Sequence, residues 1–435
     1  MRSNYLMALS VCLALPFETP MAQAPQEFVV DPSWPKPLPE GWINATLGHP
    51  CVDAHDHILV IDRQNITEEE AETSVPTPPM MLFDLQGNLI DSWGDAEQVP
   101  MSIHGCGFDS DNNVWVVGNA DGIAQKYSHS GELLIQVGTR GVLDTHAGTA
   151  IREPDNSINR APLNAGQDRF FFPAGVAVDP ENNDVYFADG YGNKRIVVFD
   201  ETGRYLRQWG QQATLEQTRD GIGGAFSYSL HCVVMRKTGL IYVCDREGLR
   251  VQVFDKLGNF VRNIWVKTGN ATLPDTRGTV WGLAFSPDED QKYLYVLDGR
   301  HEQVHVLNHA SGEILSSFGR PGHQIGNFTV AHGLAVAFLL VRRLRGLPQR
   351  ATTGLLLPHG NVARVPGRGL LALARQRREA AGQRARGVAA RRCWRRARRA
   401  RRARPGPPPG TARPRQPEDP RGSAGLAATT AGPGR

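Results

Sequence analysis

Cysteine is scarce in this chain, which has six in 435 residues. Cys12 lies in an N-terminal segment that we expect to be removed, and Cys393 lies in a basic tail. The four that remain are too few to form a disulfide scaffold, so burial of apolar side chains must stabilise the fold. Their pairing cannot be read from the sequence. We expect Cys106 and Cys232 to act as small hydrophobic residues of a sheet.

Long apolar runs are also missing. The apolar run Tyr5–Phe17 is too short to span a membrane, and no later stretch qualifies as a membrane span. This run follows Arg2 and precedes the small-x-small sequence Ala22-Gln23-Ala24. The pattern is typical of a secretory signal, so we predict a signal peptide over residues 1–24 and a periplasmic or secreted protein. The alternative is a buried N-terminal helix.

Lysine is absent from residues 337–435, which hold 24 arginines and three acidic residues. Residues 1–336 therefore carry 24 basic and 41 acidic side chains, although the whole chain has a net charge of +4. An acidic body gives no reason to expect nucleic acid as a partner. The tail could be a basic arm for an anionic partner, a low-complexity linker, or out-of-frame translation of GC-rich DNA. We favour the third, because the repeat described next breaks off inside a strand.

A repeat fills the body of the chain. Each unit has four short β-rich runs separated by Gly, Asn and Asp turns, and several units end in an aromatic residue and Gly. The units span residues 48–94, with an insertion at Asn65–Pro79, then 104–138, 174–210, 231–266 and 281–319, and a sixth begins at His332. A four-stranded repeat of this length is typical of a propeller blade. We predict an all-β, six-bladed β-propeller over residues 25–336 with an incomplete sixth blade. A β-sandwich is the alternative, and the repeated aromatic-Gly ending argues against it.

Three histidines occupy one position of this repeat. An Asp five residues further on sets the register in three units (Asp53, Asp109 and Asp179), and the starting residues are then Gly48, His104, Ala174, His231, Trp281 and His332. Alternate blades of six lie a third of a turn apart, so three imidazoles would converge on the axis. Three protein ligands and an open position are typical of a catalytic zinc site. The innermost strands of a propeller line its central channel. Any one of these histidines could therefore be a hydrogen-bonded residue of that channel and not a metal ligand.

Several segments of the body resemble peptidyl-α-hydroxyglycine α-amidating lyase, also called peptidylamidoglycolate lyase, a six-bladed propeller of the NHL-repeat kind. They are FFFPAGVAVDPENNDVYFADGYGNKRIVVF, IYVCDREGLRVQVF and IHGCGFDSDNNVWVV, and the similarity covers about residues 44 to 336. The resemblance implies that His104, His231 and His332 bind zinc. It also implies that Tyr191 is the active-site base and that Arg246 and Arg63 are active-site arginines.

The sequence departs from the family at several positions. The family's cysteine in DGYCN is Gly192 here, and the cysteines flanking its DREN blade are Tyr242 and Val253, so both family disulfides are missing. The acidic residue that follows the third histidine, a calcium ligand in the family, is Gly333. Structural calcium is therefore less expected than zinc.

Two further functions compete with the lyase. The first prediction is a zinc-dependent lyase that cleaves the C–N bond of a peptidyl-α-hydroxyglycine-type substrate to an amide and glyoxylate, acting as a monomer on a small-molecule or peptide substrate. The second is a non-enzymatic NHL propeller that binds a peptide, glycan or protein partner. The third is a calcium-dependent lactonase, which is disfavoured because the channel offers imidazoles and calcium prefers oxygen ligands. Tyr191 could also be a rim residue and Arg246 a solvated or salt-bridged surface group, since each follows the Asp that closes a second strand.

Overall fold

The computed structural model describes residues 28–144, 164–324, 326–340, 351–357 and 361–364. All of them belong to one compact unit, Met1–Leu373. The predicted signal peptide and most of residues 337–435 lie outside the described residues. Within the described residues, no helix is both long enough and apolar enough to cross a membrane.

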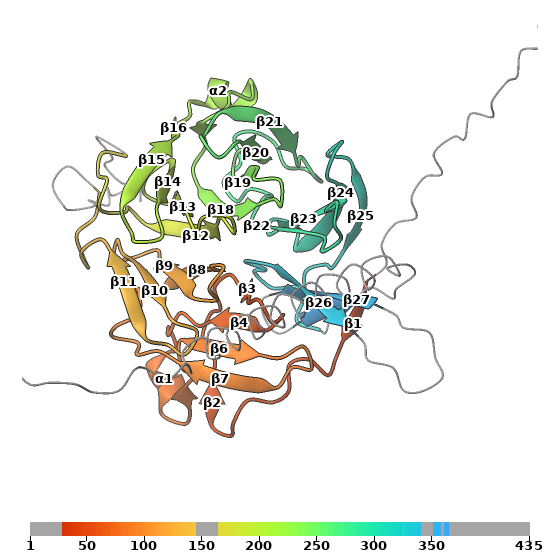
Figure 1. The fold of residues 1–435 in the computed structure, drawn as a ribbon. Helices are drawn as coiled ribbons and strands as arrows, with labels where there is room; N and C mark the ends of the chain where they lie inside the picture. The colour runs from red at the N-terminus through yellow and green to blue at the C-terminus, as the bar shows by residue number, and fades with distance from the viewer. Residues whose placement is uncertain (1–27, 145–163, 325, 341–350, 358–360, 365–435) are drawn as a thin grey trace, which may run out of the picture. The chain divides into compact units, whose positions relative to one another are not determined.

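Four-stranded antiparallel sheets make up most of the described chain, and we number them as blades in chain order (Figure 1). The first blade holds β3 (Cys51–Val52), β4 (Ile58–Ile61), β6 (Met80–Phe83) and β7 (Leu89–Trp93). The second holds β8 (Ile103–Phe108), β9 (Val114–Gly118), β10 (Ala124–Tyr127) and β11 (Leu133–Val137). The third holds β12 (Pro173–Val178), β13 (Val185–Asp189), β14 (Arg195–Phe199) and β15 (Tyr205–Trp209).

Two more blades follow the same order. The fourth holds β18 (Leu230–Met235), β19 (Ile241–Asp245), β20 (Arg250–Phe254) and β21 (Phe260–Trp265). The fifth holds β22 (Gly282–Phe285), β23 (Tyr293–Asp298), β24 (Gln303–Asn308) and β25 (Ile314–Phe318). The first strand of each blade lies innermost and the fourth at the rim (Figure 1). The prediction of an all-β propeller is therefore confirmed.

A further four-stranded sheet joins the two ends of the described chain. It holds β26 (Ala335–Leu340), β27 (Ala351–Leu357), β28 (Asn361–Arg364) and, as its outer strand, β1 (Val29–Asp31), which pairs with β28. The innermost strands then contact one another in a closed ring, β3–β8–β12–β18–β22–β26–β3. The predicted boundary after Val336 falls inside β26, and two strands lie beyond it. The count of six blades and the incomplete sixth blade both stay predictions, because the side chains of β27 and β28 are outside the description.

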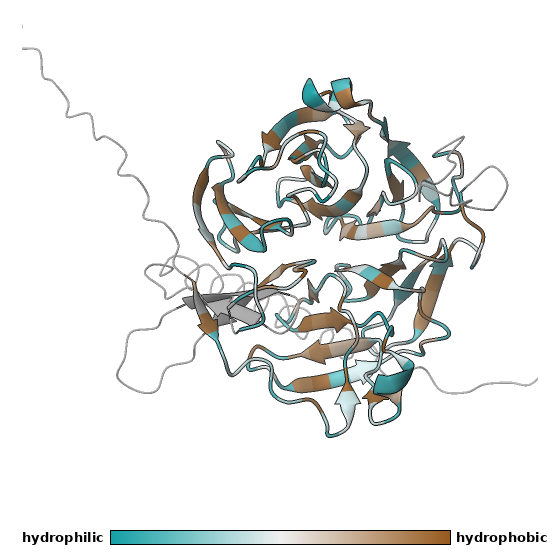
Figure 2. Ribbon diagram, turned by 180° about the vertical axis from the view of Figure 1, so that it is seen from behind, coloured by the Kyte–Doolittle hydropathy of each residue, from teal (hydrophilic) through white to brown (hydrophobic). Residues whose placement is uncertain are grey.

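The hydrophobic core lies between neighbouring blades. Middle strands such as β9, β13 and β19 are buried along their whole length and consist largely of apolar residues, although β13 and β19 each end in a buried Asp. The hydrophobic colour of many strands is visible in Figure 2. One buried cluster joins Val243 of the fourth blade to Ala188 of the third, and another joins Cys244 of the fourth to Leu283 of the fifth. Each blade therefore buries its faces against its neighbours, as expected of a repeat that cannot fold alone.

The repeated aromatic residue and the repeated Gly turn contact each other across the blade boundary. A Cβ on Gly131 would lie 2.9 Å from the ring of Trp93, and one on Gly258 would lie 2.6 Å from the ring of Trp209. Both glycines have positive φ, 89° and 90°. The last strand of one blade thus packs on the turn before the last strand of the next, where only glycine fits.

The remaining elements are short. They are the helices α1 (Glu68–Ala71) and α2 (Leu215–Arg219) and the parallel strand pairs β2 (Trp42–Ile43) with β5 (Val75–Pro76), and β16 (Gln211–Gln212) with β17 (Ala225–Phe226). The predicted insertion at Asn65–Pro79 contains α1 and β5. Both helices begin with a threonine capping box, at Thr67 and Thr214.

All four cysteines of the body form disulfides, so the prediction that Cys106 and Cys232 are small hydrophobic residues was wrong. Cys51 of β3 is bonded to Cys106 of β8, with their Cα atoms 5.9 Å apart, and Cys232 of β18 is bonded to Cys244 of β19. The first bond joins two blades whose innermost strands converge toward the axis. The two residues are 55 positions apart in the sequence, and the packing of neighbouring blades brings them together.

Candidate metal centre and its surroundings

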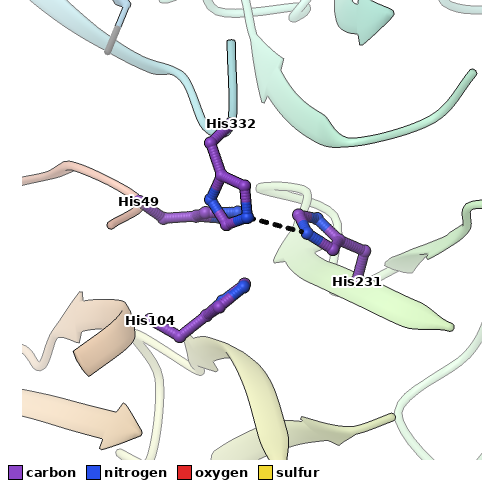
Figure 3. Close-up of side chains that lie close together, drawn as sticks. All are labelled: His49, His104, His231 and His332. Carbon is purple, nitrogen blue, oxygen red and sulfur yellow. Dashed lines mark hydrogen bonds between the residues drawn. The ribbon is translucent and has the colours of Figure 1, made fainter. Parts of the chain in front are cut away.

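Four histidines meet where the innermost strands begin (Figure 3). His104 and His231 are the second residues of β8 and β18, while His49 and His332 lie just before β3 and β26. Their ring centroids lie between 4.5 and 5.2 Å apart in every pair. One ring nitrogen of each lies within 4.8 Å of the others. We call these four residues the central cluster.

The structure brings the three predicted histidines together and adds a fourth that the sequence reasoning missed. His49 was not identified as a candidate ligand, because the register set by Asp53 places Gly48 at the position that histidine occupies in other units. The equivalents of His49 are Gly105, Gly175, Cys232, Gly282 and Gly333. The backbone before β3 bonds in two directions, since the N–H of Gly48 donates to the carbonyl of Ile61 in β4 and the N–H of His49 donates to the carbonyl of His104 in β8. The sequence did contain a signal for this ligand, because His49 directly follows the register position at Gly48.

Backbone carbonyls of the next blade orient two of the imidazoles. His104 Nδ1 lies 2.7 Å from the carbonyl oxygen of Ala174, and His231 Nδ1 lies 2.5 Å from that of Trp281. Since a carbonyl can only accept, each Nδ1 carries the proton and each Nε2 keeps a lone pair. An N–H held in this way by a carbonyl is the usual outer support of a metal-bound histidine.

The lone pairs of the central cluster are available at neutral pH. Burial lowers the pKa of His49 to about 3, and the charge of Arg63 adds to this effect. Burial, followed by the neighbouring His332, also lowers the pKa of His104 and of His231 well below the ordinary value. These imidazoles are therefore neutral in the folded protein, which is the form that binds a metal.

The spacing of the ring nitrogens fits a shared ion. Nε2 of His231 and Nε2 of His332 lie 3.2 Å apart, close to the ~3.3 Å that separates two nitrogen ligands of a tetrahedral zinc with Zn–N bonds of about 2.0–2.1 Å. Nε2 of His49 and Nδ1 of His332 are buried and have no hydrogen-bond partner within the described residues. Buried polar atoms left unpaired are costly, and a bound cation would satisfy them.

Tyr191 and Arg246 lie beside the central cluster. The Tyr191 hydroxyl lies 3.2 Å from His104 Nε2 and 3.3 Å from Arg246 Nη1. Arg246 stacks 4.6 Å from the ring centre of Trp281 and donates hydrogen bonds of 2.6 and 2.9 Å to Glu247. Glu247, which was missed from the sequence, also accepts from the backbone N–H of Ser229. It follows Arg246 directly in the DREG segment, and this adjacency was the signal for it.

The second predicted arginine also reaches the central cluster. Arg63 Nη2 lies 3.3 Å from His332 Nε2, and Arg63 Nε is buried without a hydrogen-bond partner among the described residues. Burial lowers the pKa of this guanidinium, although Tyr191 opposes the shift. Arg63 therefore has an unused donor next to the candidate metal position.

Tyr191, which the resemblance implies is the active-site base, lies in surroundings that disfavour its ionised form. Burial raises the pKa of Tyr191, and the positive charges of Arg246 and Arg63 only partly offset that rise. The phenol is therefore protonated at neutral pH in the metal-free site. Desolvation of the phenolate is the larger effect, and the two cations only reduce it.

Comparisons with known proteins bear on this centre. The NHL repeat model matches residues 170–199. The chain is 31% identical over 182 residues to peptidyl-glycine alpha-amidating monooxygenase A of Xenopus laevis, which is 40% of this chain and 18% of that protein. It is 32% identical over 145 residues to a probable peptidyl-alpha-hydroxyglycine alpha-amidating lyase of Caenorhabditis elegans, which is 32% of this chain and 37% of that protein. The resemblance to an NHL-repeat propeller of the α-amidating lyase kind is thus confirmed.

Other relatives limit what this resemblance says. NHL repeat-containing protein 3 of Homo sapiens is 26% identical over 273 residues, which is 61% of this chain and 65% of that protein. A virginiamycin B lyase structure from Staphylococcus aureus has a TM-score of 0.44 and 11% identity, over 79% of this chain and 100% of that chain, which is too weak a likeness to bear on function. The chain spans less than two thirds of the length of each curated relative named here.

Proposed function

We propose that this protein is a zinc-dependent lyase that cleaves the C–N bond of a peptidyl-α-hydroxyglycine-type substrate, releasing an amide and glyoxylate. The observation that carries the proposal is the convergence of four neutral imidazoles, with Tyr191 and Arg246 in hydrogen-bond range of each other beside them. We also propose that the sheet of β1, β26, β27 and β28 completes a six-bladed propeller that acts as a monomer, in the periplasm or after secretion.

The donor set of the central cluster suits zinc. All four candidate ligand atoms are imidazole nitrogens, which late first-row metals prefer, whereas calcium takes oxygen. His104, His231 and His332 would hold the ion, with His49 either as a fourth ligand or beside it. Bound zinc would lower the pKa of a substrate hydroxyl next to it.

Tyr191 is the group in place to move the proton. Loss of the amide from an α-hydroxyglycine breaks the C–N bond, and the bonding electrons leave with nitrogen. The hydroxyl loses its proton as its oxygen becomes the aldehyde oxygen of glyoxylate, and the amide nitrogen gains one proton. Tyr191 is protonated at rest, so it can give its proton to nitrogen and recover one from the hydroxyl, with no net change.

The two arginines would hold the substrate carboxylate. Arg63 has an unpaired buried Nε, and Arg246 directs Nη1 toward Tyr191 while Glu247 occupies its Nε and Nη2. A guanidinium binds a carboxylate with directed hydrogen bonds. Glu247 and Trp281 act as positioning residues, because they fix the plane of the Arg246 guanidinium.

A non-enzymatic binding propeller is the second candidate. It is favoured by the similarity to NHL repeat-containing protein 3, which covers more of this chain than the α-amidating enzymes do. In that case the histidines would be structural. A lactonase has less support, because the central cluster contains no carboxylate.

Glyoxylate release separates these functions. Zinc-loaded protein, purified without a histidine tag, is mixed with a synthetic peptidyl-α-hydroxyglycine, and amide and glyoxylate are quantified. We expect equal amounts of both, loss of the reaction in His104→Ala, and unchanged activity in the matched control His323→Ala, which alters an exposed histidine outside the central cluster. Correctly folded, zinc-loaded protein that releases no glyoxylate would remove the lyase proposal.

A further inference from the structure

A second group of histidines lies away from the central cluster. Asp53, His55 and His57 form the turn between β3 and β4, and His129 lies in the turn between β10 and β11 of the next blade. One candidate ligand atom of each lies within 4.8 Å of the others. We call these four residues the turn cluster.

The two clusters lie at opposite ends of the innermost strands. His49 precedes β3 whereas Asp53 follows it, and His104 begins β8 whereas Phe108 ends it, with its ring 6.1 Å from that of His129. Four residues of extended strand between His104 and Phe108 correspond to roughly 13 Å. The turn cluster is therefore outside the proposed active site.

The carboxylate of Asp53 divides its two oxygens between the turn and the imidazoles. Oδ1 accepts the backbone N–H groups of His55 at 2.7 Å and His57 at 2.8 Å, which fixes the turn. Oδ2 faces three ring nitrogens, His129 Nε2 at 2.9 Å, His57 Nδ1 at 3.0 Å and His55 Nδ1 at 3.7 Å. One oxygen thus lies at the centre of three potential ligands.

The turn cluster has a buried anion and an open side. The Asp53 side chain is 0% exposed, whereas the side chains of His55, His57 and His129 are 66%, 30% and 37% exposed. Burial disfavours a charged Asp53, but hydrogen bonds from His129 and from the backbone of His57 and His55 outweigh it and lower the pKa of this carboxyl. A buried negative charge with solvent access on one side is thus present at neutral pH.

Equivalent positions in other blades show what this carboxylate lacks. Asp179 has the place of Asp53 in the third blade, and it is paired at 2.5 Å with Lys256 in the turn of the fourth. Lys256 stands two residues before Gly258, as His129 stands two residues before Gly131. Asp109, the equivalent in the second blade, is paired at 2.7 Å with Lys126.

A lysine ammonium therefore compensates the charge of both Asp109 and Asp179, while Asp53 faces imidazoles instead. An imidazole, unlike an ammonium, can also bind a metal ion through a ring nitrogen. A divalent ion held by these imidazoles and by Asp53 would supply the charge that lysine supplies at the other two positions.

We propose that Asp53, His55, His57 and His129 form a structural binding site for a zinc-type divalent cation that joins the first blade to the second. Three imidazole nitrogens and one carboxylate oxygen are a common donor set for zinc and other late first-row metals. Four protein ligands fill a tetrahedral shell, which is typical of a structural site and not of a catalytic one. This site is independent of the function proposed for the central cluster.

The substitution His129→Lys offers a matched test, because it copies the Asp179–Lys256 pair and so retains the charge balance of the turn while it removes a ligand. Both measurements use the full chain carrying His104→Ala and His231→Ala, which remove two of the four central histidines, after treatment with a chelator. Zinc is titrated by calorimetry, and the midpoint of thermal unfolding is followed with and without zinc.

We expect the protein with both central substitutions to bind one zinc ion at the turn cluster with micromolar or tighter affinity and to unfold at a higher temperature when zinc is present. Adding His129→Lys should abolish both effects while the protein stays folded, and adding His55→Ala, which alters an exposed side chain, should weaken binding at least about tenfold. Binding only at millimolar zinc, or equal binding with lysine at position 129, would show that a protonated imidazole balances Asp53 and would overturn the proposal.

Discussion

The central cluster and the turn cluster use the same side chain in opposite surroundings. The four central histidines are buried, have two arginines nearby and include no carboxylate. The turn cluster is partly open to solvent and is built around the charged Asp53. A site of neutral donors leaves the full charge of a bound dication to act on a substrate, whereas a site with a carboxylate partly neutralises it. This difference is the basis on which we propose chemistry at the centre and a structural role at the turn.

Of the changes considered, Tyr191→Phe should have the largest effect on catalysis, and it alters the central site alone. We expect kcat for glyoxylate release to fall by about 10²- to 10⁴-fold, the usual contribution of a positioned proton donor. The bound zinc should stay unchanged, since Tyr191 contacts His104 by a hydrogen bond and supplies no nitrogen ligand. A variant that keeps full activity would show that the proton moves by another route.

His49→Ala tests whether the central site needs its fourth histidine. A small residue fits at this position, because the equivalent residue is glycine in the second, third and fifth blades and before β26. We expect zinc affinity to fall by about 10- to 100-fold, while activity at saturating zinc is retained through the other three histidines. Complete loss of zinc at saturating concentrations would mean that all four imidazoles are required for binding.

Acid should destabilise the central cluster before the turn cluster. Because the folded-state pKa of His49 lies below its unfolded value of 6.5, its contribution to stability is present above pH 6.5 and is lost as the pH falls toward about 3. The pKa of Asp53 is lowered in the folded protein. Its contribution to stability is therefore present above the ordinary pKa of 3.8 and is lost only as the pH falls below that value.

Urea unfolding of metal-free protein at pH 7 and pH 5 measures this difference. His49 alone should cost on the order of 2 kcal/mol of unfolding free energy between these pH values. His49→Ala should show a correspondingly shallower pH dependence. Equal stability at the two pH values would contradict the assignment of neutral buried histidines.

His129→Lys should have the smallest effect on catalysis. The turn cluster lies at the far end of the innermost strands, so glyoxylate release at 25 °C should stay within about twofold of the original protein, the range of independent distant sites. A large change in KM with unchanged stability would show that the two clusters are coupled, and the division of roles would then be wrong.

Much of this architecture follows from the repeat in the sequence. The spacing of strands and turns predicts blades, and one shared register predicts that His104, His231 and His332 converge. These features depend on local pattern and on the symmetry of the ring, both of which are visible in a linear sequence. Their role as zinc ligands stays a prediction.

Features that depend on contacts between blades could not be predicted in this way. His49 lies one residue out of register, the Cys51–Cys106 bond joins two blades, and β1 pairs with β28 across the whole length of the described chain. The turn cluster combines a DAHDH turn with a single histidine from the next blade, and each piece alone looks like solvated turn residues. Such groups are set by the closure of the ring.

The zinc K-edge absorption spectrum of the His129→Lys protein loaded with one equivalent of zinc tests the central claim most directly, because the turn cluster is then removed. We predict a first shell of three or four imidazole nitrogens at about 2.0–2.1 Å. A shell dominated by oxygen, or a spectrum unchanged by His104→Ala, would contradict a metal centre at the four central histidines.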